Sequence, residues 1–248
     1  MKKVFLLFFC ALSTLFSSCT TSGKSPKLHI CTMASHETRN LDQLFDSCEA
    51  HNLSVEVLGI GEPFSWALRL KKYKEFLKGL PENDVAMFVD AYDILILADE
   101  RTILERFKGM NAPIVFSTEV HCHPFFHLGQ YYPPSPTKFK YLNAGSYIGY
   151  VKDLKKMFEA ISPIPEETDD QGLFSVYFLY NPGVFKLDYH NELFISLLEV
   201  TEEEIEMDQS AKSIRYVGTN SSPCVVHGNS SGKQLYQTIY NKVFRSAN

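Results

Sequence analysis

Two aspartates three residues apart are the first feature of this sequence that could do chemistry. Asp90 and Asp93 flank Tyr92 and come directly after the apolar run Val85–Val89, which predicts a short strand buried on both faces. A carboxylate beside a buried strand is costly unless a positive group meets it, and a divalent cation is such a group. Because open α/β sheets bind ligands at the carboxyl ends of their strands, the position suits a metal ion. The alternative is that Asp90 caps a turn and Asp93 starts a helix.

Two further segments carry groups of polar residues. Asp169, Asp170 and Gln171 head a run with helical spacing, where capping and the helix dipole explain one acidic residue better than both. His227 follows the last apolar run of the chain and precedes glycines, an amide, hydroxyls and Lys233. Backbone N–H groups and one point charge of this kind can hold a pyrophosphate. A lone histidine after a strand is otherwise an ordinary satisfied polar group.

Strands and helices alternate along the first half of the chain. This alternation predicts a parallel α/β sheet, with strands over residues 28–34, 53–59, 85–89 and 113–117 and helices over 38–52, 65–79 and 100–108. The helix over 65–79 carries lysines and Arg69 on a face that we expect to be solvated.

The second half is less regular. Residues 121–140 predict a long loop, in which the His and Cys residues are more simply polar lining than a metal site. A strand over 141–150 contains Gly145 and Gly149, which permit close approach of a ligand. Further elements are expected as helices over 153–161, after 169 and over 234–244, strands over 185–189, 194–198 and 224–227, and an acidic loop or helix start over 201–209.

Composition restricts the functional class. The chain has 248 residues, of which 45% are hydrophobic and 21% charged, which argues against a disordered chain and predicts one large or two small domains. The formal net charge is −5 and no basic stripe is present, which argues against nucleic acid as a partner. Aromatic residues reach 13%; most should serve core packing, although such rings also suit sugar or base stacking.

The first residues predict export. Residues 1–18 have two lysines, an apolar centre and small residues before Cys19, the layout of a secretory signal. Residues 15–19 also resemble a bacterial lipobox, so we expect Cys19 to be lipidated, with a plain signal peptide or an uncleaved anchor as alternatives. Residues 19–27 would form a flexible tether, followed by one folded domain over 28–248. The expected location is the cell envelope, with membrane contact only through the lipid.

Four cysteines remain beyond Cys19. No C-x-x-C spacing occurs and pairing cannot be deduced. Cys31 and Cys224 lie in or beside apolar runs, which favours buried free thiols.

Taken together, the motifs resemble the glycosyltransferase domain of the multifunctional collagen lysyl hydroxylases and its stand-alone bacterial and viral relatives. Four segments over about residues 28–245 carry the resemblance in the family's order: Val89-Asp-Ala-Tyr-Asp93, Leu142-Asn-Ala-Gly-Ser-Tyr-Ile-Gly149, Asp169-Asp-Gln171 and Val226-His-Gly-Asn-Ser-Ser-Gly-Lys233.

The resemblance implies a GT-A-like fold with a mixed, mainly parallel sheet flanked by helices, a UDP-sugar donor and a Mn²⁺ ion. It implies metal ligation by Asp90, Asp93 and His227, and a catalytic or acceptor-orienting role for Asp169 and Asp170. The residues implied in nucleotide or donor binding are Thr32, Met33, Ala34, Tyr92, Asn143, Gly145, Gln171, Gly228, Asn229 and Lys233.

The chain also departs from the family pattern. The segment before the helix at 65–79 is shortened, and the family's nucleotide-contacting lysine has no counterpart: Ala67 stands near its place, with Arg69, Lys71 or Lys72 as possible substitutes. Our first hypothesis is therefore a metal-dependent hexosyltransferase that uses a UDP-sugar and a hydroxyl acceptor, on a protein or a glycan. The second is a catalytically silent surface lipoprotein that binds sugars. A metal phosphohydrolase would leave the motifs around Asn143 and Asp170 unexplained.

Overall fold

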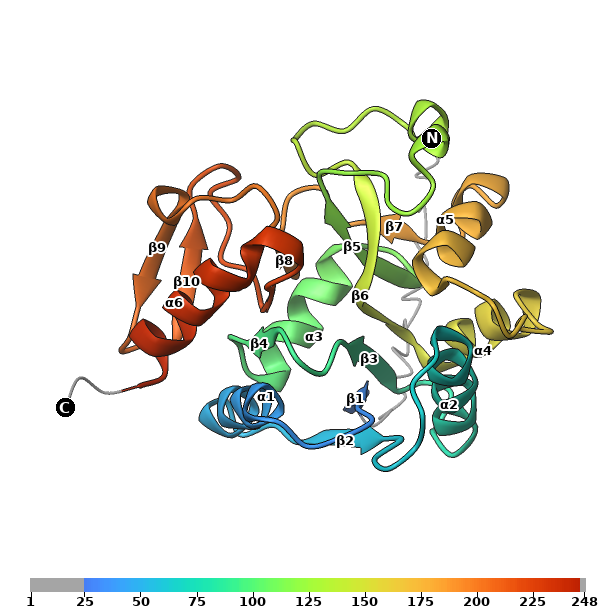
Figure 1. The fold of residues 1–248 in the computed structure, drawn as a ribbon, viewed down its shortest axis with the longest axis horizontal. Helices are drawn as coiled ribbons and strands as arrows, with labels where there is room; N and C mark the ends of the chain where they lie inside the picture. Colours follow the sequence, from blue (N-terminus) through green and yellow to red (C-terminus); the bar gives the residue numbers. More distant parts are fainter. Residues whose placement is uncertain (1–24, 246–248) are drawn as a thin grey trace, which may run out of the picture.

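The centre of the molecule is a six-stranded sheet. The computed structural model describes residues 25–245, so the predicted signal peptide and Cys19 lie outside the described residues. The strand order is β2-β1-β3-β6-β5-β7 (Figure 1), formed by β1 (Leu28–Met33), β2 (Val55–Leu58), β3 (Val85–Val89), β5 (Ile114–Glu119), β6 (Tyr141–Tyr150) and β7 (Lys186–Leu187). All strands run in one direction except β6, which is antiparallel to β3 and β5.

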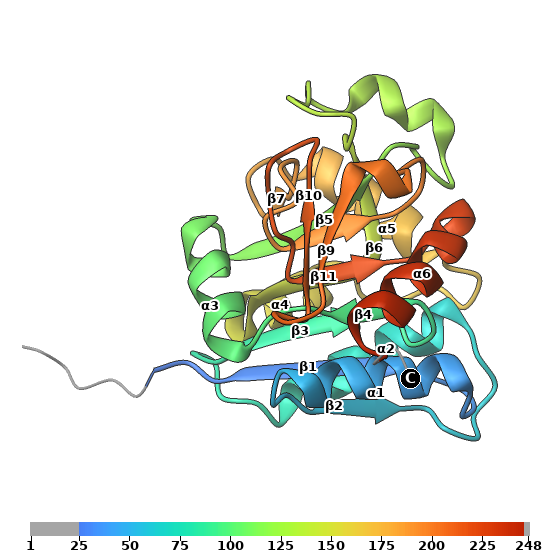
Figure 2. The ribbon, with the colours of Figure 1, turned by 90° about the vertical axis from the view of Figure 1, so that its left-hand side faces the viewer.

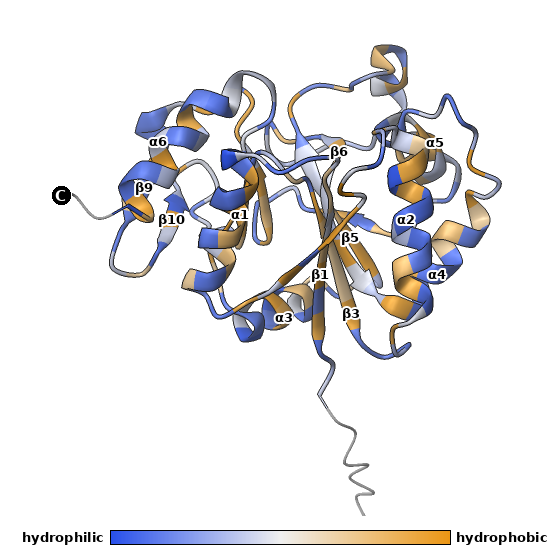
Figure 3. Ribbon diagram, turned by 60° about the horizontal axis from the view of Figure 1, so that its bottom comes forward, coloured by the Kyte–Doolittle hydropathy of each residue, from blue (hydrophilic) through white to orange (hydrophobic). Residues whose placement is uncertain are grey.

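Helices cover both faces of this sheet. One face packs against α2 (Trp66–Lys78), α4 (Val151–Ala160) and α5 (Asp170–Tyr180), and the other against α1 (Arg39–Ala50) and α3 (Glu100–Gly109). Strand β3 shows why two cores form, because Ala86 and Phe88 point into one and Val85, Met87 and Val89 into the other. The central strand β3 is therefore apolar along its whole length, whereas helices such as α2 and α4 have both apolar and polar faces (Figure 3). The predicted fold class, a mixed and mainly parallel sheet flanked by helices, is confirmed.

A smaller sheet and a hairpin extend the molecule on one side (Figures 1 and 2). The sheet consists of β4 (Ile94–Ile96), β11 (Val225–His227) and β8 (Phe194–Ser196), and the hairpin of β9 (Ile205–Asp208) and β10 (Ser213–Tyr216). A third core fills the space between them and α6 (Lys233–Val243). Short 3₁₀ turns occupy Phe126–Tyr131, Glu202–Glu204 and Ser230–Gly232.

The second half differs in part from the sequence-based expectation. Residues 205–208 form a strand where a loop or helix start was predicted, and β10 was not predicted at all. The strand over 141–150 is continuous, although its pairing with β5 shifts register between Phe116 and Ser117. The four cysteines beyond Cys19 are buried and free. Among residues 25–245, no helix is both long and apolar enough to span a membrane.

Candidate metal and nucleotide-sugar site

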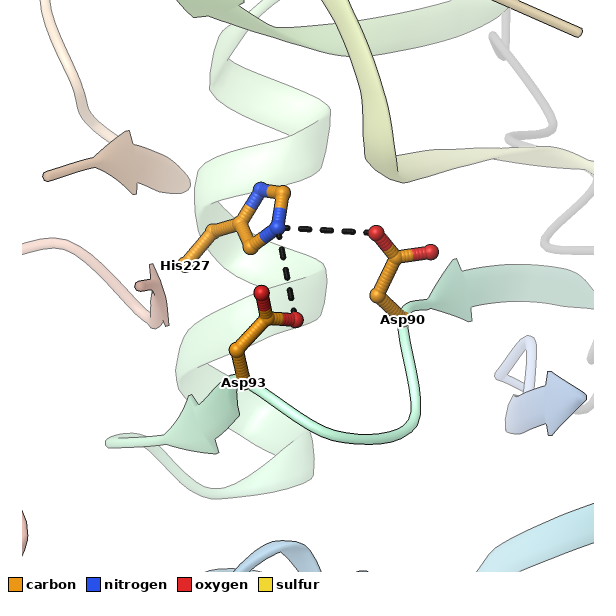
Figure 4. Close-up of side chains that lie close together, drawn as sticks. All are labelled: Asp90, Asp93 and His227. Atoms are coloured by element: carbon orange, nitrogen blue, oxygen red, sulfur yellow. Dashed lines mark ion pairs between the residues drawn. The ribbon is translucent and has the colours of Figure 1, made fainter. Parts of the chain in front are cut away.

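Strand pairing brings Asp90, Asp93 and His227 together. Asp90 follows the last residue of β3, and Asp93 precedes β4. In the small sheet His227 pairs with Ile94, so the imidazole lies beside Asp93 although the two residues are far apart in the chain. His227 Nε2 is 3.5 Å from Asp90 Oδ2 and 3.5 Å from Asp93 Oδ1 (Figure 4).

Two carboxylates and one imidazole at these separations fit a divalent cation. Ligand atoms that share one ion have bonds of roughly 2.0–2.5 Å and therefore lie a few ångströms apart. Among residues 25–245, this is the one group of three potential ligand side chains with atoms within 4.8 Å of one another. Mixed carboxylate and imidazole ligands suit Mn²⁺ among other ions.

Neighbours on β6 hold the imidazole in place. Gly145 lies against it so closely that a Cβ there would be 2.2 Å from His227 Cε1 and 2.9 Å from Asp90 Oδ2. Asn143 Oδ1 accepts the Gly145 N–H at 3.0 Å and lies 3.0 Å from His227 Nδ1. Because this oxygen can only accept, we infer that Nδ1 carries the hydrogen and Nε2 is free for a metal.

The three groups perturb one another's protonation. Burial alone would lower the pKa of His227, but Asp93 and Asp90 outweigh it and raise that pKa above its ordinary value. Burial would raise the pKa of Asp93, yet His227 and Lys233 hold it below the ordinary value. Burial prevails at Asp90, whose pKa is raised although Arg69 and His227 oppose the change.

Arg69 is the buried cation of the site. Its guanidinium is bonded to both Asp90 and Asp170, and it lies over the Trp66 ring at 4.7 Å. Only 5% of Arg69 is exposed, so the predicted solvated basic face is wrong for this residue. The reason is its place in the first turns of α2, which face the carboxylates at the sheet edge. The other possible substitutes for the missing lysine point elsewhere: Lys71 pairs with Glu166 and Lys72 with Glu62.

The N-terminus of α5 reaches the same site. Asp169 is the helix N-cap and accepts the Gly172 N–H at 2.7 Å, so its capping role is real. Asp170 is buried and bonded to Arg69. Burial raises the pKa of Asp170 although Arg69 opposes this. Gln171 Oε1 accepts the Ala144 N–H at 3.0 Å, which ties α5 to β6.

Glu119 is a site residue that the sequence analysis missed. It is the last residue of β5, 4% exposed, and accepts hydrogen bonds from Gln171 Nε2 at 2.6 Å and Asn229 Nδ2 at 3.0 Å. Burial raises the pKa of this carboxyl group although Gln171 and His227 oppose it. The rule that led to Asp90, a carboxylate at a strand's carboxyl end, would have found it had the predicted strand continued beyond Ser117.

Three adjoining cavities surround these residues. The central one, about 250 Å³, is lined by the three potential metal ligands, Arg69 and the pair Asp169–Asp170, among others. A second, about 410 Å³, lies on the side of α2 and has mostly apolar walls that include Met33, Phe64, Trp66, Tyr92 and Lys233. A third, about 610 Å³, opens on the side of β5.

The structure places the remaining predicted donor-binding residues as follows. Met33, Tyr92 and Lys233 line the second cavity. Thr32 and Ala34 are fully buried, and the Thr32 hydroxyl donates to the Val89 carbonyl at 2.7 Å. The Gly228 N–H donates to the Asp93 carbonyl at 2.8 Å. Asn229 Oδ1 accepts the Leu198 N–H at 3.2 Å while its amide nitrogen donates to Glu119.

Fold and site together match what the resemblance to a glycosyltransferase domain implies: a mixed sheet whose strand ends hold a carboxylate–imidazole cluster beside a cavity. The chain belongs to the PLOD GT domain family, whose family model matches residues 24–247. The predicted resemblance is therefore confirmed.

The relatives named here have low sequence identity to this chain and are longer than it. An uncharacterized protein of Acanthamoeba polyphaga mimivirus is 30% identical over 81% of this chain and 45% of its own length. The multifunctional procollagen lysine hydroxylase and glycosyltransferase LH3 of Homo sapiens is 27% identical over 89% of this chain and 32% of its own. The chain thus spans only about a third to a half of these relatives. Among solved structures, the mannosyltransferase PcManGT from Pyrobaculum calidifontis, in complex with GDP-Man and Mn²⁺, aligns at 11% identity and a TM-score of 0.41, covering 67% of this chain and 59% of that one.

Proposed function

We propose that this protein transfers a hexose from a UDP-sugar to a hydroxyl acceptor and requires a divalent metal ion. The observation that carries the proposal is the convergence of Asp90, Asp93 and His227 at one sheet edge of a PLOD GT domain. Its family relatives include a multifunctional procollagen lysine hydroxylase and glycosyltransferase. The silent sugar-binding protein is the alternative that the experiment below distinguishes.

Asp90, Asp93 and His227 would hold the ion, which as a Lewis acid would stabilise negative charge on the leaving diphosphate. These three ligands leave other coordination positions for phosphate oxygens. The imidazole needs no rearrangement to serve as a ligand, because Asn143 already fixes its orientation.

The second cavity supports nucleotide binding. Its aromatic walls, Phe64, Trp66 and Tyr92, offer apolar ring faces on which a base can stack. Lys233 lies at the same cavity and begins α6, so its ammonium group and the helix N-terminus both favour a phosphate there.

In the transfer itself, the bond between the anomeric carbon and the β-phosphate oxygen breaks, and its electron pair stays on UDP. The acceptor oxygen forms the new bond to the anomeric carbon and gives its proton to the departing UDP or to a carboxylate of the central cavity. Positive charge develops on the sugar ring during this exchange, so nearby carboxylates stabilise the transition state. Asp169 and Asp170 line the central cavity and are the candidates for this role or for orienting the acceptor hydroxyl.

The experiment is turnover of a panel of UDP-hexoses by the purified chain with Mn²⁺, followed as UDP release. We expect activity that EDTA abolishes and that Asp93→Ala lowers at least about 100-fold, because a metal ligand is lost. Asp42→Ala, on the exposed side of α1, is the matched control and should retain full activity.

Equal activity of Asp93→Ala and wild type would refute the metal site. Binding of UDP without turnover of any donor, even when saccharides and hydroxylysine peptides are supplied, would favour the silent sugar-binding protein.

A further inference from the structure

Arg69 and the proposed metal position share one carboxylate. The Arg69 guanidinium is bonded to Oδ1 of Asp90, whereas Oδ2 of the same carboxylate lies 3.5 Å from His227 Nε2. A divalent ion held by Asp90, Asp93 and His227 needs only one oxygen from each aspartate. Arg69 and the ion therefore bind different oxygens of Asp90, and neither has to leave for the other to bind.

The second partner of Arg69 belongs to another element. Asp170, the first residue of α5, is buried and is bonded to the other terminal nitrogen of the guanidinium. The guanidinium carbon lies over the Trp66 ring, 4.7 Å from its centroid. A fixed cation between the end of β3 and the start of α5 thus joins two carboxylates that would repel each other without it.

Burial gives the charge of Arg69 its influence on neighbouring ions. Arg69 is buried, so salt and water screen its charge little, whereas Lys233, the other cation that lines the central cavity, is exposed. A buried positive charge one carboxylate away from a divalent ion repels that ion. The same guanidinium also lines the nucleotide cavity, where it attracts a diphosphate.

We propose that Arg69 is a resident cation that makes metal binding depend on the nucleotide diphosphate. Before an ion binds, the guanidinium neutralises Asp90 and Asp170 and holds together the two elements that carry them. Its charge opposes a divalent ion that binds alone. A diphosphate bound to the ion offsets this charge, so the ion binds tightly only together with the diphosphate. The inference rests on the proposed function, because it takes the ion and a diphosphate as the ligands of this site.

The test is calorimetric titration with Mn²⁺ in the absence and in the presence of saturating UDP. In wild type, UDP should raise the affinity for Mn²⁺ at least about 10-fold, within the usual range of coupling between two ligands. Arg69→Met should bind Mn²⁺ alone at least about 10-fold more tightly than wild type, because a repulsive charge close to the ion is lost. The rise caused by UDP should be at least about 3-fold smaller in this variant than in wild type.

Asp170→Asn is the second variant, because it changes the charge of the site in the opposite direction. Loss of this carboxylate leaves Arg69 less compensated, so Mn²⁺ alone should bind at least about 3-fold more weakly than to wild type, and UDP should raise the affinity more. If Arg69 had only a structural role, both variants would bind Mn²⁺ more weakly. Opposite signs therefore separate charge from structure, and the UDP effect in Asp170→Asn tests the inference even if Arg69→Met does not fold.

Arg101→Met is the matched control, because Arg101 pairs with Glu105 on the exposed face of α3 and lines neither the central nor the nucleotide cavity. It should bind Mn²⁺ and UDP as wild type does.

Three results would overturn the inference: no effect of UDP on Mn²⁺ binding to wild type, weaker or unchanged Mn²⁺ binding by Arg69→Met, or the same UDP effect in wild type and Asp170→Asn. Failure of the proposed function is recognised separately. Turnover of a UDP-hexose with uncoupled binding of Mn²⁺ and UDP would refute the role of Arg69 alone, whereas coupled binding without turnover of any donor would refute the transfer alone.

Discussion

Replacing Arg69 by methionine should destabilise the protein by about 3–5 kcal/mol at pH 7, the cost of removing one partner from a buried ion pair. Methionine retains much of the volume of the arginine side chain, so the loss is mainly electrostatic. Arg69 is 5% exposed and Asp170 3% exposed, so the guanidinium is the counter-charge of a carboxylate shielded from water. Without it, Asp170 keeps a hydrogen bond from its own neighbour, the Gln171 N–H at 2.8 Å.

The sign of the pH dependence follows from the same contact. Burial already raises the pKa of Asp170 in the presence of Arg69, and removal of Arg69 should raise it further. A carboxyl group whose pKa is higher in the folded than in the unfolded state binds more protons when folded. The free energy of unfolding therefore falls as the pH rises from the unfolded-state pKa to the folded-state pKa. The difference between wild type and Arg69→Met should therefore be largest near pH 7 and smaller near pH 5.

The assay is equilibrium urea unfolding at both pH values in the presence of EDTA, so that no metal ion compensates the freed carboxylates. For a chain of this size, the expected loss corresponds to a fall in Tm of roughly 6–20 °C. Arg101→Met is the control, because Arg101 pairs with Glu105 on the exposed face of α3 with 83% of its side chain accessible, and no measurable change is expected. A loss below about 1 kcal/mol for Arg69→Met, or one that grows towards pH 5, would refute the reasoning.

Two further substitutions test the close packing of the site and of the sheet. Gly145→Ala should weaken Mn²⁺ binding in calorimetry at least about 10-fold, because its Cβ would displace the imidazole of His227, whereas Gly109→Ala, with nothing within 4 Å, should bind normally. Asp188→Asn should cost about 2–4 kcal/mol in urea unfolding, because the buried carboxylate accepts three backbone N–H groups from residues 192–194 that one amide oxygen cannot satisfy. Normal metal binding by the first variant, or wild-type stability of the second, would contradict these contacts.

The sequence contained enough to predict the centre of the site. An apolar run such as Val85–Val89 favours a buried strand, and carboxylates at its end favour a positive partner. Because Asp90 and Asp93 follow this strand directly, they are expected where the parallel strands of the sheet have their carboxyl ends. The distance between Asp93 and His227 was not predictable from the same pattern, because it depends on β4, three residues long, pairing with β11.

Short and half-exposed elements were the ones that the sequence did not predict. In β9 and β10 apolar and polar residues alternate over only four residues each, too short to distinguish a strand from a loop. Arg69 was misjudged for a different reason. Helical periodicity assigns a residue to a face, but it does not reveal that this face meets the carboxylates of Asp90 and Asp170.

The charges of the site give a physical reason for metal and donor to act together. Four carboxylates, those of Asp90, Asp93, Asp169 and Asp170, line the central cavity together with two permanent cations, Arg69 and Lys233. A divalent cation at Asp90 and Asp93 would offset the remaining two negative charges, so that a bound diphosphate would no longer meet a net negative site. Asp170 lies on the other side of Arg69 and would then be free to act on the positively charged sugar ring. Loss of the metal should thus weaken donor binding and transition-state stabilisation together, because both depend on the same balance of charge.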